Sequence, residues 1–366
     1  MNKKWGLSAA ALMLSAALIL PGCAKKEEPK EALTAAASKA TTDMKSYEMK
    51  TKLVINDLTI DTGTNEADAS TGQIMSMLKN AELTIDGVYQ AEPMQTELTT
   101  VLNLKGDMAM SFTVPMVMTG DKLYVKVPSI PFLPIPETIV NKFVELDLKE
   151  LAEQQGAEFN PSQMDAQKMQ KLSNEVMNTL LGEYDETKYF SNIKPKDAGL
   201  PEGVEAKQVV QFKVTNDNVK EALTILVNNA MPKIIDILGK DEYKDLLQIE
   251  PARLAEAKEE LQSSEARAEF DKNLADLNKY LTINQFHLNT ALNKDDYPVY
   301  QDMLMDIKVN DPDKGENVTV SMNASNQYSK INEKQTFKIG IPQGDDVITL
   351  EELQQQFGGS GMSTTY

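Results

Sequence analysis

The sequence is poor in the side chains from which active sites are usually built. Its 366 residues include one cysteine, one histidine and one tryptophan, and aromatic residues make up only 6%. A single thiol cannot close an internal disulfide, so the fold must depend on its apolar core. The lone His287 alternates with Phe286 and Leu288, so we expect it on the opposite face and exposed. Without a placed serine or aspartate partner it is a poor candidate for a general base. No HExxH, GxSxG, Gly-rich phosphate loop or calcium-loop spacing occurs, so the sequence predicts neither an enzyme nor a cofactor.

Positive charge is also scarce. The chain has 37 Lys and Arg residues against 55 Asp and Glu residues, a formal net charge of −18. A body this acidic is repelled by nucleic acids and by anionic lipid head groups. We therefore expect no nucleic-acid partner.

Long apolar runs are missing too. The main apolar run, Gly6 to Leu20, is uncharged and has about 15 residues, whereas a helix that spans a bilayer needs roughly 20. Lys3 and Lys4 precede this run, and the small residue Gly22 follows it. This order is typical of a secretory signal peptide, which we expect to cover residues 1–22.

The single cysteine follows directly. Leu20-Pro21-Gly22-Cys23 resembles the lipobox of bacterial lipoproteins, although proline is unusual at its position. In those proteins the cysteine takes a diacylglycerol, with palmitate-type chains, and becomes the mature N-terminus. The resemblance implies lipid attachment at Cys23, membrane binding through that anchor and an extracytoplasmic location. An ordinary cleaved signal peptide with an incidental cysteine is the alternative. Residues 23–30 are short, charged and interrupted by Pro29, which predicts a solvated tether.

Much of the remaining chain alternates apolar and polar residues with a period of two. This pattern is typical of half-buried antiparallel strands, since strands of a doubly covered parallel sheet are apolar throughout. It places the following side chains on shared strand faces: Leu83, Ile85 and Tyr89; Leu98, Leu102 and Leu104; Leu123, Val125 and Val127; Met303, Met305, Ile307 and Val309; Val318, Val320 and Met322; Phe337, Ile339 and Ile341.

Helical spacing of apolar residues predicts helices over residues 31–45, 161–182, 218–239 and 251–280. Pro232 predicts a kink or a break in the third. Since strands precede and follow these helices, we expect an α+β fold with a curved antiparallel sheet and helices on its concave face. We expect one domain over residues 31–357 and a disordered tail over 358–366. Two domains divided near residue 215 are the alternative.

The order of these segments resembles the LolA/LppX-like lipoproteins. The resemblance rests on Cys23, a first helix, the segments SYEMKTKLVI, GDKLYVKVP and KFVELDLKEL, a helical insertion and the late strands ending MNASNQYSKINEKQTFKIGIP. Members of that superfamily fold a half-barrel sheet around helices, and they carry or hold lipids or lipoproteins in the cavity between them. The resemblance implies non-enzymatic binding of an apolar ligand, here from an anchored position.

Nineteen methionines invite a more specific interpretation. Met108, Met110, Met116 and Met118 lie close together, and Met303 and Met305 share a strand face. Flexible, polarisable thioethers suit an adaptable apolar pocket, so these six are candidate cavity-lining residues. Plain core filling is one alternative. A copper(I) site is another, although the chain offers little histidine or cysteine to complete it.

One apolar segment allows two interpretations. SIPFLPIPE, from Ser129 to Glu137, is either an exposed lip that contacts a membrane or partner, or a rigid connection with buried side chains. For the whole protein, the leading hypothesis is a lipid-binding lipoprotein. The alternative is an envelope structural or protein-interaction lipoprotein with a filled core and no ligand.

Overall fold

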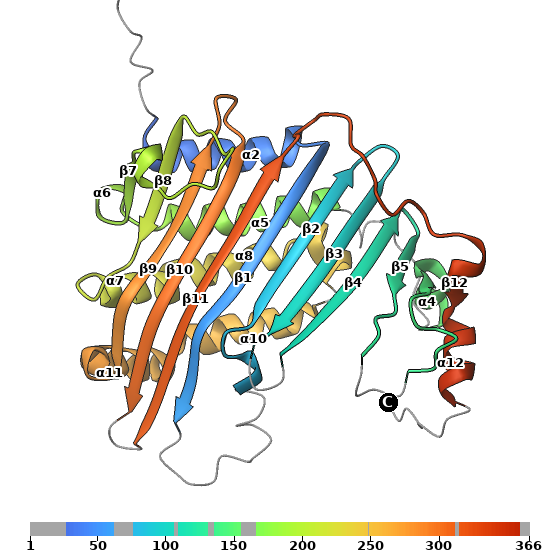
Figure 1. The fold of residues 1–366 in the computed structure, drawn as a ribbon. Helices are drawn as coiled ribbons and strands as arrows, with labels where there is room; N and C mark the ends of the chain where they lie inside the picture. The colour runs from blue at the N-terminus through green and yellow to red at the C-terminus, as the bar shows by residue number, and fades with distance from the viewer. Residues whose placement is uncertain are drawn as a thin grey trace, which may run out of the picture.

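The computed structural model describes residues 27–61, 76–105, 109–130, 135–154, 166–247, 249–311 and 315–358. Cys23 and Met108 lie outside these ranges. The fold is α+β, as predicted, and is built on one open, curved sheet of twelve strands (Figure 1). The strand order is β12-β6-β5-β4-β3-β2-β1-β11-β10-β9-β8-β7. Every neighbouring pair is antiparallel except β12 and β6, which are parallel.

Strands from before and after the helical segments share this sheet. The first strand pairs with its sequence neighbour β2 on one side and with the late strand β11 on the other. The strands are β1 Ser46–Asp61, β2 Glu82–Gln90, β3 Gln95–Leu104, β4 Met110–Thr119, β5 Lys122–Lys126, β6 Phe143–Asp147, β7 Phe190–Ile193, β8 Gln208–Lys213, β9 Leu281–Leu292, β10 Pro298–Asp311, β11 Glu316–Ser329 and β12 Val347–Thr349.

In Figure 1, helices α2, α5, α8, α10 and α11 lie behind the sheet, across one of its faces. The helices of the described residues are α2 Pro29–Asp43, α4 Leu148–Gln154, α5 Ala166–Gly182, α6 Glu186–Tyr189, α7 Val219–Ile225, α8 Met231–Leu238, α9 Asp241–Leu247, α10 Pro251–Gln262, α11 Ser264–Tyr280 and α12 Leu350–Gly358, with short turns of other helix types at Pro195–Asp197 (η3), Leu226–Ala230 (η4) and Gly344–Asp346 (η5).

The register of the strands gives the sheet two different faces. Leu53, Leu83 and Leu102 lie directly opposite one another on β1, β2 and β3, so they point to the same side. We call this side, which α2 and α5 cover, the inner face, and the opposite side the outer face. The period-two prediction that Leu83, Ile85 and Tyr89 share a face, as do Leu98, Leu102 and Leu104, is confirmed.

The main core lies at the β7–β9 end of the sheet. Helix α2 begins at Pro29, which suits a first helical turn, and buries Ala32, Ala36 and Ala40 along one stripe. These small side chains let the helix approach β7 and β8 closely. The buried cluster contains Ala32, Ala36, Tyr184, Tyr189, Phe190, Val210, Phe212, Val214, Val219, Ala222, Ile283 and Leu292.

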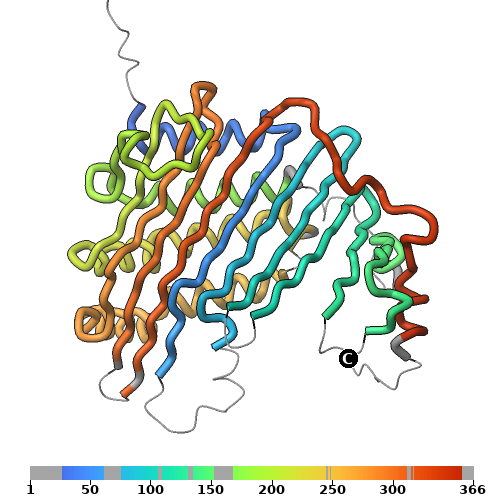
Figure 2. Tube along the Cα trace, in the orientation of Figure 1, coloured from blue at the N-terminus to red at the C-terminus, as the bar shows by residue number. Residues whose placement is uncertain are grey.

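The prediction of a strand at QTFKIGI, with Phe337, Ile339 and Ile341 on one face, is wrong. After β11 the chain forms no strand until Val347, and it passes across the top of the sheet to β12 and α12 (Figure 2). Its backbone N–H groups bond to a glutamate side chain instead of to a neighbouring strand. Of the three apolar side chains, Ile339 packs on the outer-face cluster of Val117, Tyr124 and Phe143, whereas Ile341 is 45% exposed.

Two helix predictions also need correction. The expected helix over 251–280 is two helices, because Ser263 adopts an extended conformation and its hydroxyl accepts a bond from the Ala266 N–H that caps α11. Pro232 does not break its helix. The five-residue π-helical segment Leu226–Ala230 precedes it, and α8 continues through the proline at its first turn.

Three strands escaped the sequence analysis. β7 and β12 have four and three residues, too few to show a period, and β8 reads QVVQFK with adjacent buried valines. Of the helices in the described ranges, none combines the length and apolar character needed to span a membrane.

Candidate functional site

A hollow of about 410 Å³ lies between the inner face of the sheet and helices α2 and α5. We call it the inner hollow. Its lining consists of Leu33, Ala36, Ala37, Ala40 and Met44 in and after α2, Met169, Gln170, Ser173, Asn174, Met177, Asn178 and Leu181 of α5, and Tyr47, Tyr89, Leu288, Thr290, Pro298, Gln301 and Tyr328 of the sheet. No Asp, Glu, Lys, Arg or His of the described chain is part of this lining. An occupant would therefore meet apolar carbon and neutral polar groups.

Amide side chains join the two helices that form one wall of the inner hollow. Gln170 donates from Nε2 to the Ala40 carbonyl at 3.0 Å, and Asn174 donates from Nδ2 to the Ala37 carbonyl at 2.9 Å. Each bond uses one side-chain donor, and both carbonyls lie along α2. These hydrogen bonds fix α2 and α5 relative to each other. The apolar residues of the two helices therefore need not pack against the sheet and fill the inner hollow.

Three tyrosines line the sheet wall of the inner hollow. The rings of Tyr47 and Tyr89 lie 5.1 Å apart between centroids, and Tyr47 meets Tyr328 edge-on at 5.2 Å. Burial, with the neighbouring Tyr328 and Tyr89, raises the pKa of the Tyr47 hydroxyl above its ordinary value. Burial raises the pKa of Tyr328 as well. These phenols stay neutral at physiological pH and offer hydroxyl groups beside apolar ring faces.

A second space, which we call the side hollow, adjoins the first. It has a volume of about 280 Å³ and lies between α5, α7, the π-helical segment η4 and strands β8 to β10. Its lining is apolar apart from Tyr184, whose hydroxyl donates to the Ala222 carbonyl at 3.1 Å. Leu181 lines both hollows. The inner hollow and the side hollow are therefore neighbours, and Leu181 is part of the wall of each.

The predicted cavity-lining methionines have mixed positions. Met110, Met116 and Met118 are half-buried on β4, where Met116 lies opposite Leu98. Met303 and Met305 are half-buried on β10, opposite Leu288 and Phe286 of the inner face. None of these five is among the residues that line the inner or the side hollow.

Three other methionines do line the inner hollow. They are Met44, Met169 and Met177, and the last two are 46% and 42% exposed. Met169, Ser173 and Met177 recur every four residues on α5, a signal that could have been read from the sequence. Leu172 and Val176 of the same helix face away from the hollow and pack with Ile237 and Tyr243.

His287 lies on the outer face, opposite to the side of Phe286 and Leu288, as predicted. Its expected exposure is wrong, because only 22% of the side chain is exposed and its Nε2 lies 3.9 Å from Oδ2 of Asp302. Asn289 donates to the same oxygen at 3.0 Å. Burial raises the pKa of the Asp302 carboxyl above its ordinary range, against the opposing effects of Asn289 and His287. No other catalytic partner of His287 is present in the described residues.

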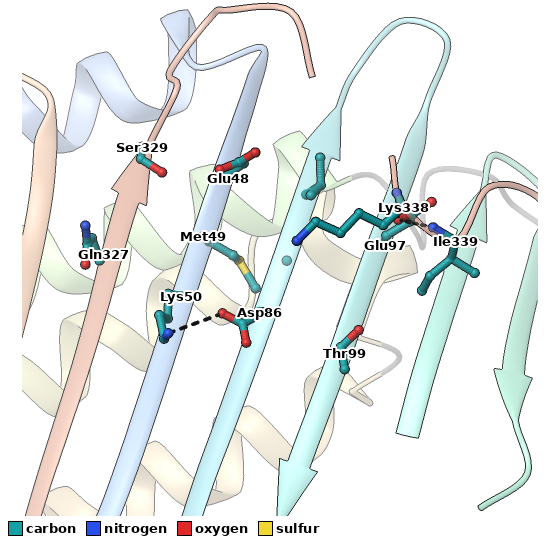
Figure 3. A pocket seen from close by; sticks show the side chains of 12 residues that line it. Glu48, Met49, Lys50, Asp86, Glu97, Thr99, Gln327, Ser329, Lys338 and Ile339 are labelled. Atoms are coloured by element: carbon teal, nitrogen blue, oxygen red, sulfur yellow. Dashed lines mark hydrogen bonds and ion pairs between the residues drawn. The ribbon is translucent and has the colours of Figure 1, made fainter. Parts of the chain in front are cut away.

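The outer face carries a polar hollow of about 480 Å³, which we call the outer groove (Figure 3). Its floor is two rows of side chains across four strands. Ser329, Glu48, Val88 and Glu97 form one row, and Gln327, Lys50, Asp86 and Thr99 form the other. Lys338 and Ile339 of the segment after β11 form one side. In Figure 3 the Lys338 side chain extends over β2 towards β1.

Glu97 holds that segment to the sheet. Its side chain is only 4% exposed, and its carboxylate accepts the backbone N–H groups of Lys338, Ile339 and Gly340 at 2.8, 3.0 and 2.6 Å. A buried charge needs compensation of this kind. The three bonds also explain why residues 338–340 do not extend the sheet.

Part of the SIPFLPIPE segment is visible. Ile135 packs against the cluster of Ile139, Val144 and Ile348, which agrees with a rigid connection at that residue. Phe132 and Leu133 lie outside the described residues.

No group of three or more His, Cys, Asp or Glu side chains in the described ranges could hold a metal ion.

A family model described as a family of unknown function (DUF6612) matches residues 240–344, which run from the start of α9 to the turn before β12. The match covers under a third of the chain, and its description states no activity. No curated protein matches the chain.

Proposed function

We propose that this protein is a membrane-anchored bacterial lipoprotein that binds an apolar ligand, a lipid or an acyl chain, between its sheet and its helices. The observation that carries the proposal is the inner hollow, which is formed by two helices and the sheet and has no charged side chain in its lining. The interior of such a hollow favours hydrocarbon over water, at about 25 cal/mol for each Å² of apolar surface removed from water.

The inner face around the hollow supports the same proposal. Leu53, Leu83 and Leu102 lie in a row on this face and are only half-buried. Apolar rows in a solid core are normally covered completely, so these strands can bury further surface against a ligand. The Met residues at the mouth, Met169 and Met177, are flexible enough to adapt to ligands of different shape.

The LolA/LppX-like resemblance supports the proposal and implies more about the protein. By that resemblance the sheet is a half-barrel, the helices pack on its concave face and the ligand lies between them. Cys23 carries the diacylglyceryl anchor, the residues between it and the start of α2 at Pro29 are the tether, and the body lies outside the cytoplasmic membrane. The action is then non-enzymatic holding or transfer of the ligand at a membrane surface.

A fluorescent fatty acid tests the proposal. Ala37 lines the inner hollow, whereas Ala35 of the same helix is exposed, so Ala37→Phe should fill the hollow and Ala35→Phe should not. We expect the protein to bind cis-parinaric acid and the Ala37→Phe variant to bind it about tenfold more weakly, since loss of the apolar contact of two CH₂ groups exceeds 1.4 kcal/mol. Equal binding by the two folded variants would contradict the proposal and favour the ligand-free envelope protein.

A further inference from the structure

The outer groove does not belong to the inner hollow, and its chemistry differs. It continues into a neighbouring hollow of about 490 Å³, because Gln327 and Ser329 line both. The second part lies beside the loop Gly203–Lys207 and the turn between β9 and β10. Together they form an elongated depression that runs across the strands. Four strands spaced about 4.8 Å apart make the floor of the first part alone roughly 14 Å wide.

Charges in this depression are closely balanced, although the chain as a whole carries −18. Most of its charged groups already have partners. Lys330 pairs with Glu48 at 2.7 Å, Lys50 lies 3.8 Å from Asp86, and Lys207 pairs with Asp296. Glu97 is compensated by backbone N–H groups. A polyanion or a polycation would therefore gain little net Coulomb attraction here.

Neutral hydrogen-bonding groups remain between these pairs. The side chains of Thr99, Gln327 and Ser329 line the groove, as does Lys338 with its ammonium group. Val88 lies in the middle of the floor and Ile339 at the side, so the polar groups surround a small apolar patch. A sugar ring presents the matching surface, because its hydroxyl groups both donate and accept hydrogen bonds while its C–H face is apolar.

An extended peptide fits the depression less well. The groove runs across the strands of the outer face, so it offers no strand edge to which a peptide backbone could add. Its small apolar patch also provides no deep pocket for anchoring side chains. We propose that the outer groove is a second binding site and that its ligand is a neutral linear oligosaccharide.

Titration calorimetry with defined hexasaccharides tests this site. The probes are chitohexaose, cellohexaose and maltohexaose, with an acidic hyaluronan hexasaccharide and the peptide (Glu-Lys)₃ for comparison. We expect at least one neutral hexasaccharide to bind in the millimolar range or tighter, and more tightly than the acidic sugar and the peptide. Binding should change little between low and high salt, since it does not depend on net charge.

Matched variants locate the binding. Lys338→Ala should weaken it about tenfold, as expected for a hydrogen bond to a charged donor, whereas Lys334→Ala, an exposed lysine of the same segment outside the groove, should not. Lys338→Ala keeps the backbone bond to Glu97, so the segment should stay attached. The site is refuted if no neutral probe binds at 10 mM ligand, at the order of the weakest useful affinities. Tighter binding of the acidic sugar or the peptide, or undiminished binding by the Lys338→Ala variant, would equally refute it.

Discussion

At the residue scale, Glu97 shows how one side chain determines the path of a whole segment. Alternation alone predicted a strand at residues 335–341, because Ile339 and its neighbours alternate as strand residues do. The sequence contained no sign that a carboxylate more than 200 residues earlier would accept the N–H groups of Lys338, Ile339 and Gly340. Contacts of this kind depend on the finished fold, so period and composition cannot reveal them.

Replacing Glu97 by Ala should destabilise the protein. The substitution leaves three partly buried backbone donors without an acceptor, which we expect to cost about 3 kcal/mol in total. Glu97→Gln, which keeps one oxygen acceptor, should cost less. Urea unfolding measures the loss, and hydrogen exchange should show faster exchange at residues 338–340. The exposed Glu333 of the same segment is the control. Equal stability of the Glu97→Ala and Glu333→Ala variants would show that the three bonds contribute nothing.

Asp302 gives a prediction that depends on pH. Burial raises the pKa of its carboxyl in the folded protein, so ionisation of Asp302 opposes folding at neutral pH. This cost is present above the folded pKa and disappears as pH falls below the ordinary carboxyl pKa of about 3.9. The Asp302→Asn variant should therefore unfold at a higher urea concentration than the parent at pH 7.

The advantage of that variant should narrow as the pH is lowered towards 4. Asn keeps an oxygen that can accept the bond from Asn289, so packing is preserved. Asp295→Asn, at an exposed turn, should show no comparable change. A variant that is less stable than the parent by the same amount at both pH values would contradict the assignment of the cost to a buried charge.

At the scale of elements, the sequence correctly predicted the long helices and strands whose apolar residues recur with a regular period. Strands β2, β3, β5, β10 and β11 and helices α2, α5 and α7–α8 follow from their apolar spacing. The prediction of one helix over residues 251–280 was wrong, because the single residue Ser263 interrupts the helical pattern. The predicted set of strands was incomplete, because β7 and β12 are very short. The inner hollow was missed residue by residue, because α5 has two apolar sides. Leu172 and Val176 lie on the side of α5 that faces away from the inner hollow, and they pack against Ile237 and Tyr243. Met169 and Met177 lie on the other side and line the hollow.

The junction between α10 and α11 can be tested through its cap. Ser263 accepts a hydrogen bond from Ala266 N–H at 3.1 Å. We expect Ser263→Ala to lower the free energy of unfolding by about 1 kcal/mol, as is usual for loss of an N-cap. The adjacent Ser264 is exposed and is the first residue of α11, after the N-cap, so Ser264→Ala should be close to neutral. If the helices were continuous in solution, the effects of the two substitutions would be the same.

At the scale of the whole molecule, we propose that an anchor at Cys23 determines where the protein acts. Cys23 is the only thiol, so replacing it removes every site for thioether attachment. We expect the Cys23→Ser variant to lose the mass of the diacylglyceryl group and to leave the membrane fraction on washing with salt, since stable attachment requires more than one acyl chain. Detergent-resistant membrane attachment of this variant would refute the anchor while leaving the binding proposal intact.

The central claim is that the space between sheet and helices holds an apolar molecule. Native mass spectrometry of the protein, extracted from its own membranes in mild detergent, tests it most directly. We predict a population heavier than the acylated chain by one ligand, releasable on collisional activation, present in the Ala35→Phe variant and depleted in the Ala37→Phe variant. A single mass equal to the acylated chain in all three proteins, unchanged after incubation with lipid vesicles, would contradict the account.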